Sequence, residues 1–294
     1  MRNNPQLTVL VAFGLLVLIG GVNFVAVRFS NQELYPFWGA GLRFATASFL
    51  LFIFVYLKRL SLPRGRALVG AILYGILNFG ATYAFVYVAL VQISAGLAAV
   101  IMSLVPLITI FLAFLQGLEK IKLRVIIGGL IAAGGVALLF NNQLSINAPT
   151  LYILAMLAGA VAAAETGVVV KKFPKSDPVV TNAVGMGVGA GLLLILAIVS
   201  KEPLLIPEMF STWVALSYLI FIGSISMFML YLFVLSKWTA SATSYMLVLT
   251  PIVAVLASAW LEKTTISIIF LVSSVLVIAG VYIGALASLK SKLD

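Results

Sequence analysis

Cysteine and histidine are both absent from the 294 residues of this sequence, and charged residues make up only 9% of it. Without cysteine there can be no disulfides and no thiolate metal sites. Without histidine, the commonest metal ligand and the usual general base near pH 7 are missing. The sequence also lacks a Walker-type phosphate loop. We therefore expect no metal, no cofactor, no enzymatic activity and no ATP hydrolysis from this chain.

Apolar residues are abundant, at 63% of the chain against roughly 45–50% in soluble domains. A soluble protein of this length cannot bury so much apolar surface, whereas a lipid bilayer can accept it. A helix needs about 20 apolar residues to cross a bilayer. Ten stretches of that kind cover residues 7–27, 37–57, 67–89, 94–116, 123–141, 150–170, 179–200, 212–235, 240–261 and 266–288. We predict an all-α integral membrane protein of ten transmembrane helices.

The placement of lysine and arginine predicts how these helices are oriented. With the N-terminus in the cytoplasm, fourteen cations fall in inner segments and three in outer loops. The inner cations are Arg2, Lys58, Arg59, Arg64, Arg66, Lys120, Lys122, Arg124, Lys171, Lys172, Lys175, Lys237, Lys290 and Lys292, and the outer ones are Arg28, Lys201 and Lys263. Cytoplasmic loops carry the excess of Lys and Arg. We expect a multi-pass protein with both termini cytoplasmic, in a bacterial or archaeal inner membrane.

The net charge of +10 is explained by this membrane topology and does not indicate nucleic acid as a partner. The partners expected are the lipid bilayer and a small-molecule substrate.

Two segments repeat the same order of residues. One runs from Ser94 through Pro106 to Glu119, and the other runs from Thr239 through Pro251 to Glu262. Each starts at a hydroxyl residue followed by alanine, reaches its proline after twelve residues and ends in Leu-Glu-Lys. We predict a duplication, with a first five-helix repeat over residues 1–144 and a second over 145–294.

Five spans per repeat is an odd number, so the second copy must enter the membrane from the opposite side. Glu119 then falls on the inner side and Glu262 on the outer side. Inverted repeats of this kind are typical of secondary transporters, whose substrate site lies near the midplane between the two halves. The sequence therefore predicts two inverted repeats and a central site.

The pattern resembles the drug/metabolite transporter superfamily, in particular its EamA-type ten-helix branch. The residues that carry the resemblance in the first half are Gly21-Val22-Asn23-Phe24-Val25, Leu42-Arg43-Phe44, Ala89-Leu90, Ser94-Ala95-Gly96, Pro106, Glu119, Gly128, Gly134 and Gly135. In the second half they are Thr239-Ala240, Pro251, Glu262 and Gly280. The resemblance implies a carrier that exports amino acids and related metabolites, with spans one, three, four, six, eight and nine around the cavity.

Arg43 and Glu165 are the ionisable residues that fall well inside the expected spans. A charge at mid-bilayer costs about 2.5–3.5 kcal/mol on insertion scales, so each needs a partner, water or a function. Glu165 is a candidate for proton coupling or for binding a substrate amine, and the alternative is a carboxylate that reaches toward Lys171 or Lys172. Arg43 either ties span two to neighbouring carbonyls or contacts a substrate carboxylate. Asn23 aligns with Glu165 in the equivalent helix, so it is a second candidate for a central site.

Asn78 and Thr82 lie four residues apart on one face of span three. They can line a cavity, or they can support close packing with a neighbouring helix. Tyr83, Ser226 and Tyr245 are further candidates for substrate contact. The offset of 145 residues that aligns the two prolines pairs Asn78 with Gly223.

Pro106 and Pro251 interrupt spans four and nine at related positions. Each removes a backbone hydrogen bond, which allows either a static bend or a hinge for alternating access. Glycines such as Gly187 and Gly191 form small-xxx-small sets, which indicate close helix contacts.

The sequence thus favours a secondary transporter that exports an amino acid or a related compound through a midplane site between inverted repeats. A carrier of another solute class, such as a nucleoside, a sugar or a drug-like compound, is the first alternative. A membrane-embedded lipid enzyme or a channel would require a catalytic dyad at one interface or repeated polar rings, and neither pattern is visible.

Overall fold

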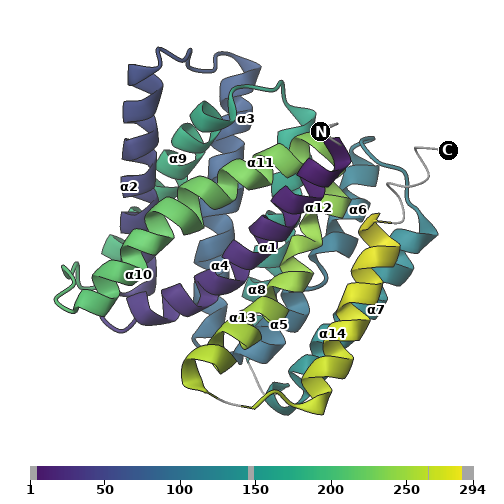
Figure 1. Ribbon diagram of the computed structural model, residues 1–294. Helices are drawn as coiled ribbons and strands as arrows, with labels where there is room; N and C mark the ends of the chain where they lie inside the picture. The colour runs from purple at the N-terminus through teal and green to yellow at the C-terminus, as the bar shows by residue number, and fades with distance from the viewer. Residues whose placement is uncertain (1–4, 145–148, 264, 287–294) are drawn as a thin grey trace.

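The computed structural model describes residues 5–144, 149–263 and 265–286, and in these ranges the chain is helical with no strand (Figure 1). The helices of the first half are α1 (Pro5–Ser30), α2 (Pro36–Leu57), α3 (Arg66–Tyr74), η1 (Gly75–Ala81), α4 (Thr82–Leu90), α5 (Ala95–Met102), α6 (Val105–Leu115), α7 (Leu123–Leu139) and η2 (Asn141–Gln143). Those of the second half are α8 (Thr150–Lys172), α9 (Pro178–Val199), α10 (Phe210–Ile220), η3 (Phe221–Ser226), α11 (Met227–Lys237), α12 (Ala240–Ser244), α13 (Met246–Glu262), α14 (Ile268–Val281) and η4 (Tyr282–Leu286).

Nine helical segments of the described chain are long and apolar enough to cross a membrane, and α7 is a shorter apolar helix. Several of these segments join consecutive elements, such as Arg66–Leu90, which contains α3, η1 and α4. The nine segments and α7 correspond to the ten stretches expected from hydropathy. The expected boundary between the repeats, at residues 144 and 145, lies at the edge of the described residues. The last residues of the tenth stretch, 287 and 288, lie outside them.

Local sequence explains where the helices begin. The hydroxyls of Ser94, Thr239 and Ser267 each accept the backbone N–H of the third residue of the helix that follows, α5, α12 and α14. Asp177 caps α9 in the same way, and Pro178 occupies its first turn, where no N–H is needed. The caps of α5 and α12 lie at equivalent places in the two repeats, so the duplicated residues have duplicated local structure.

The two repeats cross each other in space. Helix α1 packs against α10, α11 and α13 of the second half, and α8 packs against α3, α4, α5 and α6 of the first half. Two further pairs, α2 with α9 and α7 with α14, join equivalent helices of the two repeats (Figure 1). An exchange of partners of this kind is what an inverted repeat produces. The substrate site expected between the halves must therefore lie where α1 and α2 meet the second repeat, or where α8 and α9 meet the first.

Glycine permits the closest of these helix contacts. A Cβ atom on Gly128 would lie 2.5 Å from the carbonyl oxygen of Gly280, and one on Gly189 would lie 2.2 Å from the Cβ of Phe79. In the Gly187–Gly191 set only Gly187 packs closely: a Cβ there would lie 2.9 Å from the Oγ of Ser48, whereas a Cβ on Gly191 would meet nothing within 4 Å. On the same helix, α9, both members of the pair Gly185 and Gly189 pack closely. Gly185 lies against Tyr74, and Gly189 lies against Phe79.

Spans four and nine are broken near their prolines. In span four the break separates α5 from α6, and Pro106 is the second residue of α6. In span nine the break separates α12 from α13, and Pro251 lies inside α13. The carbonyl of Leu247, which loses its N–H donor at Pro251, accepts the Thr250 hydroxyl at 3.2 Å. Each proline therefore lies close to an interruption of its transmembrane span, and such an interruption is a place where a hinge could act.

Spans three and eight contain a second irregularity that the sequence did not predict. The middle of each is π-helical, over η1 in span three and η3 in span eight. The offset of 145 places η1 over residues 220–226, which nearly coincides with η3 (Phe221–Ser226). Short π-helical insertions are rare and frequently occur at functional sites. Here they mark equivalent points in the two repeats.

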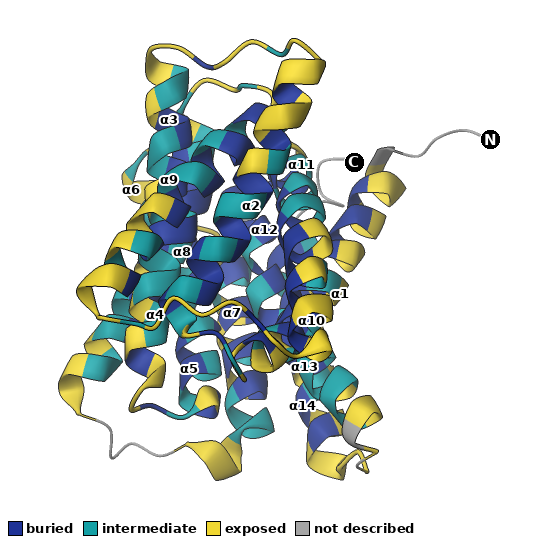
Figure 2. Cartoon of the chain, turned by 90° about the vertical axis from the view of Figure 1, so that its left-hand side faces the viewer, coloured by how far each residue is buried: buried dark blue, intermediate teal, exposed yellow. Residues whose placement is uncertain are grey.

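The outward faces of the bundle are apolar. Figure 2 shows exposed residues along the outside of the helices and buried residues in the interior. Large exposed side chains in the middle of spans include Phe49, Phe111, Leu130 and Val275, which are 54–66% exposed. A contiguous apolar exterior of this height requires a lipid environment. The protein is a multi-pass membrane protein.

The bundle has two ends that differ in charge. We call the end that holds the α2–α3, α6–α7, α8–α9 and α11–α12 connections the lysine-rich side, and the other end the opposite side. Helix α1 begins and η4 ends on the lysine-rich side, which is uppermost in Figure 1.

Candidate functional site

A cluster of buried polar side chains lies where α1 and α2 meet η3. The Nδ2 of Asn23 donates to the carbonyl oxygen of Gly223 at 3.1 Å and to the sulfur of Met227 at 3.2 Å. Arg43 donates through Nη2 to the same carbonyl at 3.1 Å and through Nε to the Ser224 hydroxyl at 2.7 Å. We call Asn23, Arg43, Gly223 and Ser224 the central cluster. Two side chains of the first repeat thus converge on one carbonyl of the second.

The central cluster lies near the middle of the membrane-spanning bundle. Gly223 is thirteen residues from the start and fourteen from the end of the segment Phe210–Lys237. Arg43 is only 2% exposed and Asn23 only 8%. A buried polar group without a hydrogen-bond partner costs about 1–3 kcal/mol, so polar groups at this depth are expected to be paired or to serve a ligand.

The π-helical backbone explains why the Gly223 carbonyl can accept two donors. Hydroxyl side chains donate back to carbonyls five residues earlier in this region, as Ser224 does to Leu219 at 2.8 Å and Ser226 does to Phe221 at 2.9 Å. In a π segment each carbonyl pairs with the fifth residue along the chain, so the carbonyls of η3 do not follow the regular α-helical pattern. Glycine is also required for space, because a Cβ on residue 223 would lie 2.2 Å from the Oδ1 of Asn23.

Aromatic side chains surround the guanidinium of Arg43. Its Cζ lies 4.6 Å from the ring centre of Phe44 and 5.8 Å from that of Tyr83, and Nη2 lies 3.5 Å from the Tyr83 hydroxyl. Ring-to-ring contacts of 4.6–6.4 Å connect a larger aromatic group, made of Phe37, Phe44, Tyr74, Phe79, Tyr83, Tyr87, Phe228 and Tyr231. Arg43 is thus in contact with an apolar aromatic group in which four of the rings, those of Tyr74, Tyr83, Tyr87 and Tyr231, carry a hydroxyl.

Asn78 and Thr82 lie in span three, at the segment that corresponds to η3 of span eight, but their side chains differ in their hydrogen bonds. Asn78 is in the middle of η1, twelve residues from each end of Arg66–Leu90, and its Nδ2 is buried without a hydrogen-bond partner. The Thr82 hydroxyl donates to the Leu77 carbonyl at 2.7 Å, five residues back, just as Ser226 does in span eight. The Asn78 amide interacts with the Tyr74 hydroxyl but makes no hydrogen bond of good geometry, whereas the hydroxyls of Thr82 and Ser226 donate to carbonyls of their own π segments.

Tyr245 lies apart from the other candidates. It is completely buried, and its hydroxyl donates to the Val125 carbonyl of α7 at 2.9 Å. Its ring occupies the space next to Gly284, where a Cβ would come within 2 Å of the tyrosine oxygen. These contacts belong to the packing of the α12–α13 junction against α7 and η4.

Glu165 and Arg43 do not form an ion pair. Both carboxylate oxygens of Glu165 accept from the Nε2 of Gln116, at 2.7 and 2.9 Å, and the Oε1 of Gln116 accepts from Lys172 at 3.1 Å. Gln116 follows α6, so this chain of contacts lies toward the lysine-rich side. The geometry supports the structural alternative for Glu165, with one difference. Gln116 stands between the carboxylate and the lysine that we expected it to reach.

A second link between the repeats lies on the same side. The carboxylate of Glu119 accepts from the backbone N–H of Ser241 at 3.1 Å and also from its hydroxyl. Glu119 thus holds the start of α12, where the positive end of the helix favours a carboxylate. The Leu-Glu-Lys motif that revealed the repeat has this structural role in the first half.

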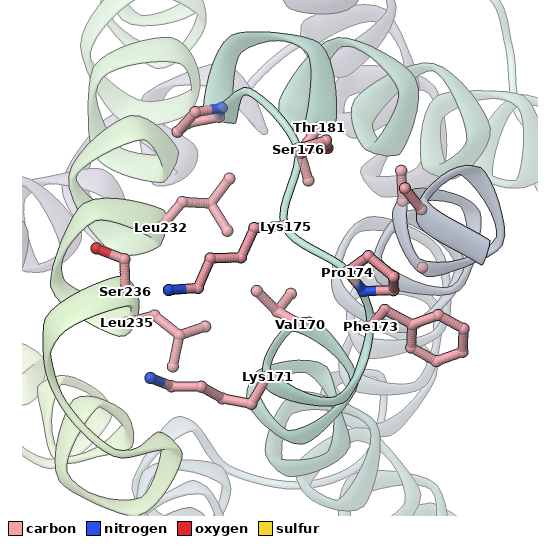
Figure 3. Close-up of a pocket in the computed structure, with 14 residues that line it drawn as sticks. Val170, Lys171, Phe173, Pro174, Lys175, Ser176, Thr181, Leu232, Leu235 and Ser236 are labelled. Atoms are coloured by element: carbon pink, nitrogen blue, oxygen red, sulfur yellow. Dashed lines mark hydrogen bonds between the residues drawn. The ribbon is translucent and has the colours of Figure 1, made fainter. Parts of the chain in front are cut away.

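A pocket of about 330 Å³ opens on the lysine-rich side, among α3, α8, α9 and α11 (Figure 3). Leu232 and Leu235 of α11 face Val170 of α8 across it, and the side chains of Lys171 and Lys175 extend into its mouth. Thr181 of α9 also lines the pocket, and the next residue, Asn182, is fully buried and accepts the Tyr74 hydroxyl at 3.0 Å. Asn182 thus connects α9, which lines the pocket at Thr181, to the aromatic group through Tyr74.

Carboxylates close the opposite side. Glu202, after α9, accepts from the backbone N–H groups of Phe37 and Trp38 at 3.2 and 2.7 Å, at the start of α2. Glu33, after α1, accepts from the N–H groups of Glu208 and Met209 before α10. The nearby Thr212 hydroxyl and these two amides hold the pKa of Glu33 below its ordinary value. Loops of the two repeats are thus joined on the opposite side by carboxylate-to-backbone hydrogen bonds.

Sequence reasoning found Asn23, Arg43 and Tyr83, which the structure brings together, but missed their partners. Gly223 was visible only as the residue that the 145-residue offset pairs with Asn78. The side chains of Ser224, Gln116 and Asn182 had no signal beyond polarity inside an apolar span. No group of three or more Asp or Glu residues that could hold a metal lies within the described part of the chain.

Comparison with known proteins agrees with this architecture. The EamA-like transporter family matches the chain twice, over residues 7–141 and 150–285. The chain belongs to the EamA-like transporter family. Because the two matches cover nearly the whole chain, each five-helix half is one copy of the family domain, and the protein is a membrane transporter that handles a small-molecule substrate within the lipid bilayer.

Relatives of this transporter occur in bacteria and archaea. The uncharacterized inner membrane transporter YedA of Escherichia coli K12 is 30% identical over 269 residues, which cover 91% of this chain and 87% of YedA. An uncharacterized transporter of Archaeoglobus fulgidus is 28% identical over 282 residues, covering 93% and 97% of the two chains. One solved crystal structure superposes with a TM-score of 0.82 at 19% identity, over 96% of this chain and 98% of the other. The last likeness concerns the fold alone.

Proposed function

We propose that this EamA-family protein is a secondary transporter that carries an amino acid or a related metabolite by alternating access, with the substrate bound at the central cluster. The observation that carries the proposal is the convergence of Asn23 and Arg43 of one repeat on Gly223 in the middle of the other. Transport by inverted repeats requires a site at their common interface, near the midplane. The central cluster has that position.

The chemistry of the central cluster suits a small amphipathic solute. The Oδ1 of Asn23 is buried and accepts no hydrogen bond from the described residues, and the Nδ2 of Asn78 makes no hydrogen bond of good geometry. An ammonium group and a polar oxygen of a substrate could satisfy such atoms, and the aromatic group would contact an aliphatic or aromatic side chain. These features favour amino acids over sugars, whose many hydroxyls would need more polar partners than this site offers.

The arrangement of contacts suggests how access alternates. The opposite side is joined by Glu33 and Glu202, whereas a pocket opens on the lysine-rich side. Rocking of the repeats would exchange these states, with the breaks near Pro106 and Pro251 and the paired π segments as the points that bend. We propose that Pro106 and Pro251 act as hinges in this motion.

The lysine-rich side is proposed to face the cytoplasm, with both termini there and with residues 1–144 and 145–294 as the two moving halves. In that orientation the pocket beside Lys171 and Lys175 opens to the cell interior, which fits a carrier that loads its substrate in the cytoplasm and exports it. The orientation rests on the asymmetry of lysine and arginine between the two sides.

Counterflow tests the transport proposal. Purified protein in liposomes loaded with pooled amino acids should accumulate labelled amino acids above empty liposomes, and splitting the pool should identify the substrate. Uptake of labelled nucleosides or sugars in place of amino acids would reassign the solute class. If folded, inserted protein moves none of these solutes, the transport proposal at this site is contradicted.

Glu165 provides a prediction about coupling. Because Glu165 contacts Gln116 and lies outside the central cluster, Glu165→Gln should change the transport rate by only about twofold to threefold and leave its pH dependence unchanged. The same measurement with Glu208→Gln, an exposed residue, is the control. A flattened pH profile in Glu165→Gln alone would assign the coupling proton to Glu165.

A further inference from the structure

The hydrogen bonds of Arg43 leave one of its terminal nitrogens unoccupied. A guanidinium has five N–H donors. In Arg43, Nε binds Ser224 and Nη2 binds the Gly223 carbonyl and approaches Tyr83, whereas Nη1 donates to none of the described residues. The Arg43 side chain is therefore held in place through Nε and Nη2, and the two N–H donors of Nη1 remain for a ligand.

The charge of Arg43 is also unpaired. Six carboxylates belong to side chains that the structure describes, namely Glu33, Glu119, Glu165, Asp177, Glu202 and Glu208, and none forms an ion pair with Arg43. Glu202 contacts the start of the same helix at Phe37, six residues or about 9 Å along the axis. Ionisable groups inside membrane bundles ordinarily pair with one another or mark substrate pathways. Arg43 has only neutral partners in the described part of the chain.

From these two observations we propose that Arg43 binds a carboxylate of the transported solute, so that the substrate itself supplies the missing counter-charge. This inference rests on the proposed transport function and deepens it. The site would accept organic acids, amino acids among them, and would discriminate against the amide of the same compound. Arginine suits this role because it stays charged at physiological pH and its Nη1 keeps two N–H donors for a carboxylate.

The surroundings of Arg43 complete such a site. Asn23 Nδ2 and Arg43 Nη2 are both 3.1 Å from the Gly223 oxygen, so these two nitrogens are no more than about 6.2 Å apart. A carboxylate on Arg43 would therefore place an adjacent substituent within reach of Asn23, whose Oδ1 is an unused acceptor. The rings of Phe44 and Tyr83 lie beside the guanidinium, and Arg43 is only 2% exposed, so its attraction for an anion is weakly screened by water.

Binding to matched acid and amide pairs tests the inference without relying on transport. The apparent dissociation constant would be measured from the ligand-induced rise in Tm of the purified protein. The probes are L-leucine with L-leucinamide, L-phenylalanine with L-phenylalaninamide, and 3-phenylpropionate with 3-phenylpropionamide. In the unmodified protein, at least one acid should bind about tenfold or more tightly than its amide.

Variants show whether Arg43 causes that preference. It should disappear in Arg43→Gln, be partly retained in Arg43→Lys, and remain unchanged in Arg66→Gln, which alters an exposed arginine at the start of α3. Arg43→Lys keeps the positive charge, so it serves as the test if Arg43→Gln fails to fold. The acid preference of Arg43→Lys should then be weaker than that of the unmodified protein.

Three results would overturn the inference. They are equal binding of every acid and its amide, an acid preference that survives in Arg43→Gln, and no binding of any of the acids. Counterflow distinguishes failure of carboxylate recognition from failure of the transport proposal. Carriage of a neutral solute would refute carboxylate recognition and keep transport, whereas acid binding with no carriage would refute transport and keep carboxylate recognition.

Discussion

Replacing Gly223 with alanine is expected to reduce counterflow at least about tenfold. The added Cβ would lie 2.2 Å from the Oδ1 and 2.9 Å from the Cγ of Asn23, so the Asn23 side chain must leave its place. Asn23 would then lose its hydrogen bonds to the Gly223 carbonyl and to Met227. Overpacking a buried site costs about 1–3 kcal/mol, so a fall in Tm should accompany the loss of transport.

Gly191→Ala is the matched control for Gly223→Ala. Both are glycines inside transmembrane helices, but a Cβ on Gly191 would meet nothing within 4 Å. Alanine is the better helix former, so Gly191→Ala should leave both Tm and counterflow close to those of the unmodified protein. Full counterflow by folded Gly223→Ala would show that the position of Asn23 does not matter for transport.

Replacing Glu202 with alanine is expected to shift the protein toward the state that is open on the opposite side. The carboxylate of Glu202 holds the first N–H groups of α2, and loss of such a cap costs about 0.5–2 kcal/mol. A change of that size alters a two-state population by roughly 2-fold to 30-fold. The pocket on the lysine-rich side should therefore be open for a smaller fraction of the time.

The absence of native cysteine makes this shift measurable. In a Ser236→Cys background, the pocket would carry the chain's single thiol, and its rate of reaction with a membrane-impermeant maleimide would report how often the pocket is open. That rate should fall in Glu202→Ala and stay unchanged in Glu208→Ala, because Glu208 contacts Glu33 only through its backbone N–H. An unchanged rate in Glu202→Ala would mean that Glu202 does not hold the opposite side closed.

The sequence was a good guide to the fold because hydropathy and membrane physics leave few choices. A stretch of about 20 apolar residues must be helical in lipid, since every backbone polar group needs an internal partner. The repeat was visible because Pro106 and Pro251, and the caps Ser94 and Thr239, impose the same local structure in both halves. All of these signals are local, so a single sequence suffices to see them.

The details of the central cluster were less predictable because they depend on contacts between distant helices. Polarity inside a span pointed to Asn23 and Arg43, but nothing local indicated that both would bind the carbonyl of Gly223, some 180–200 residues away. Tyr245 has the same polar character, yet it packs against Gly284 and binds Val125. The π segments escaped prediction as well, since their residues are as apolar as those of an ordinary helix.

Accessibility of one midplane position from both sides of the membrane tests the central claim most directly. Asn78 lies at the middle of span three, and Asn78→Cys would again place a single thiol in the chain. In oriented proteoliposomes, an impermeant maleimide should label this position when added to either side, because a carrier exposes its midplane site to each side in turn. Labelling from one side only, or from neither side, with folded protein would contradict alternating access at this site.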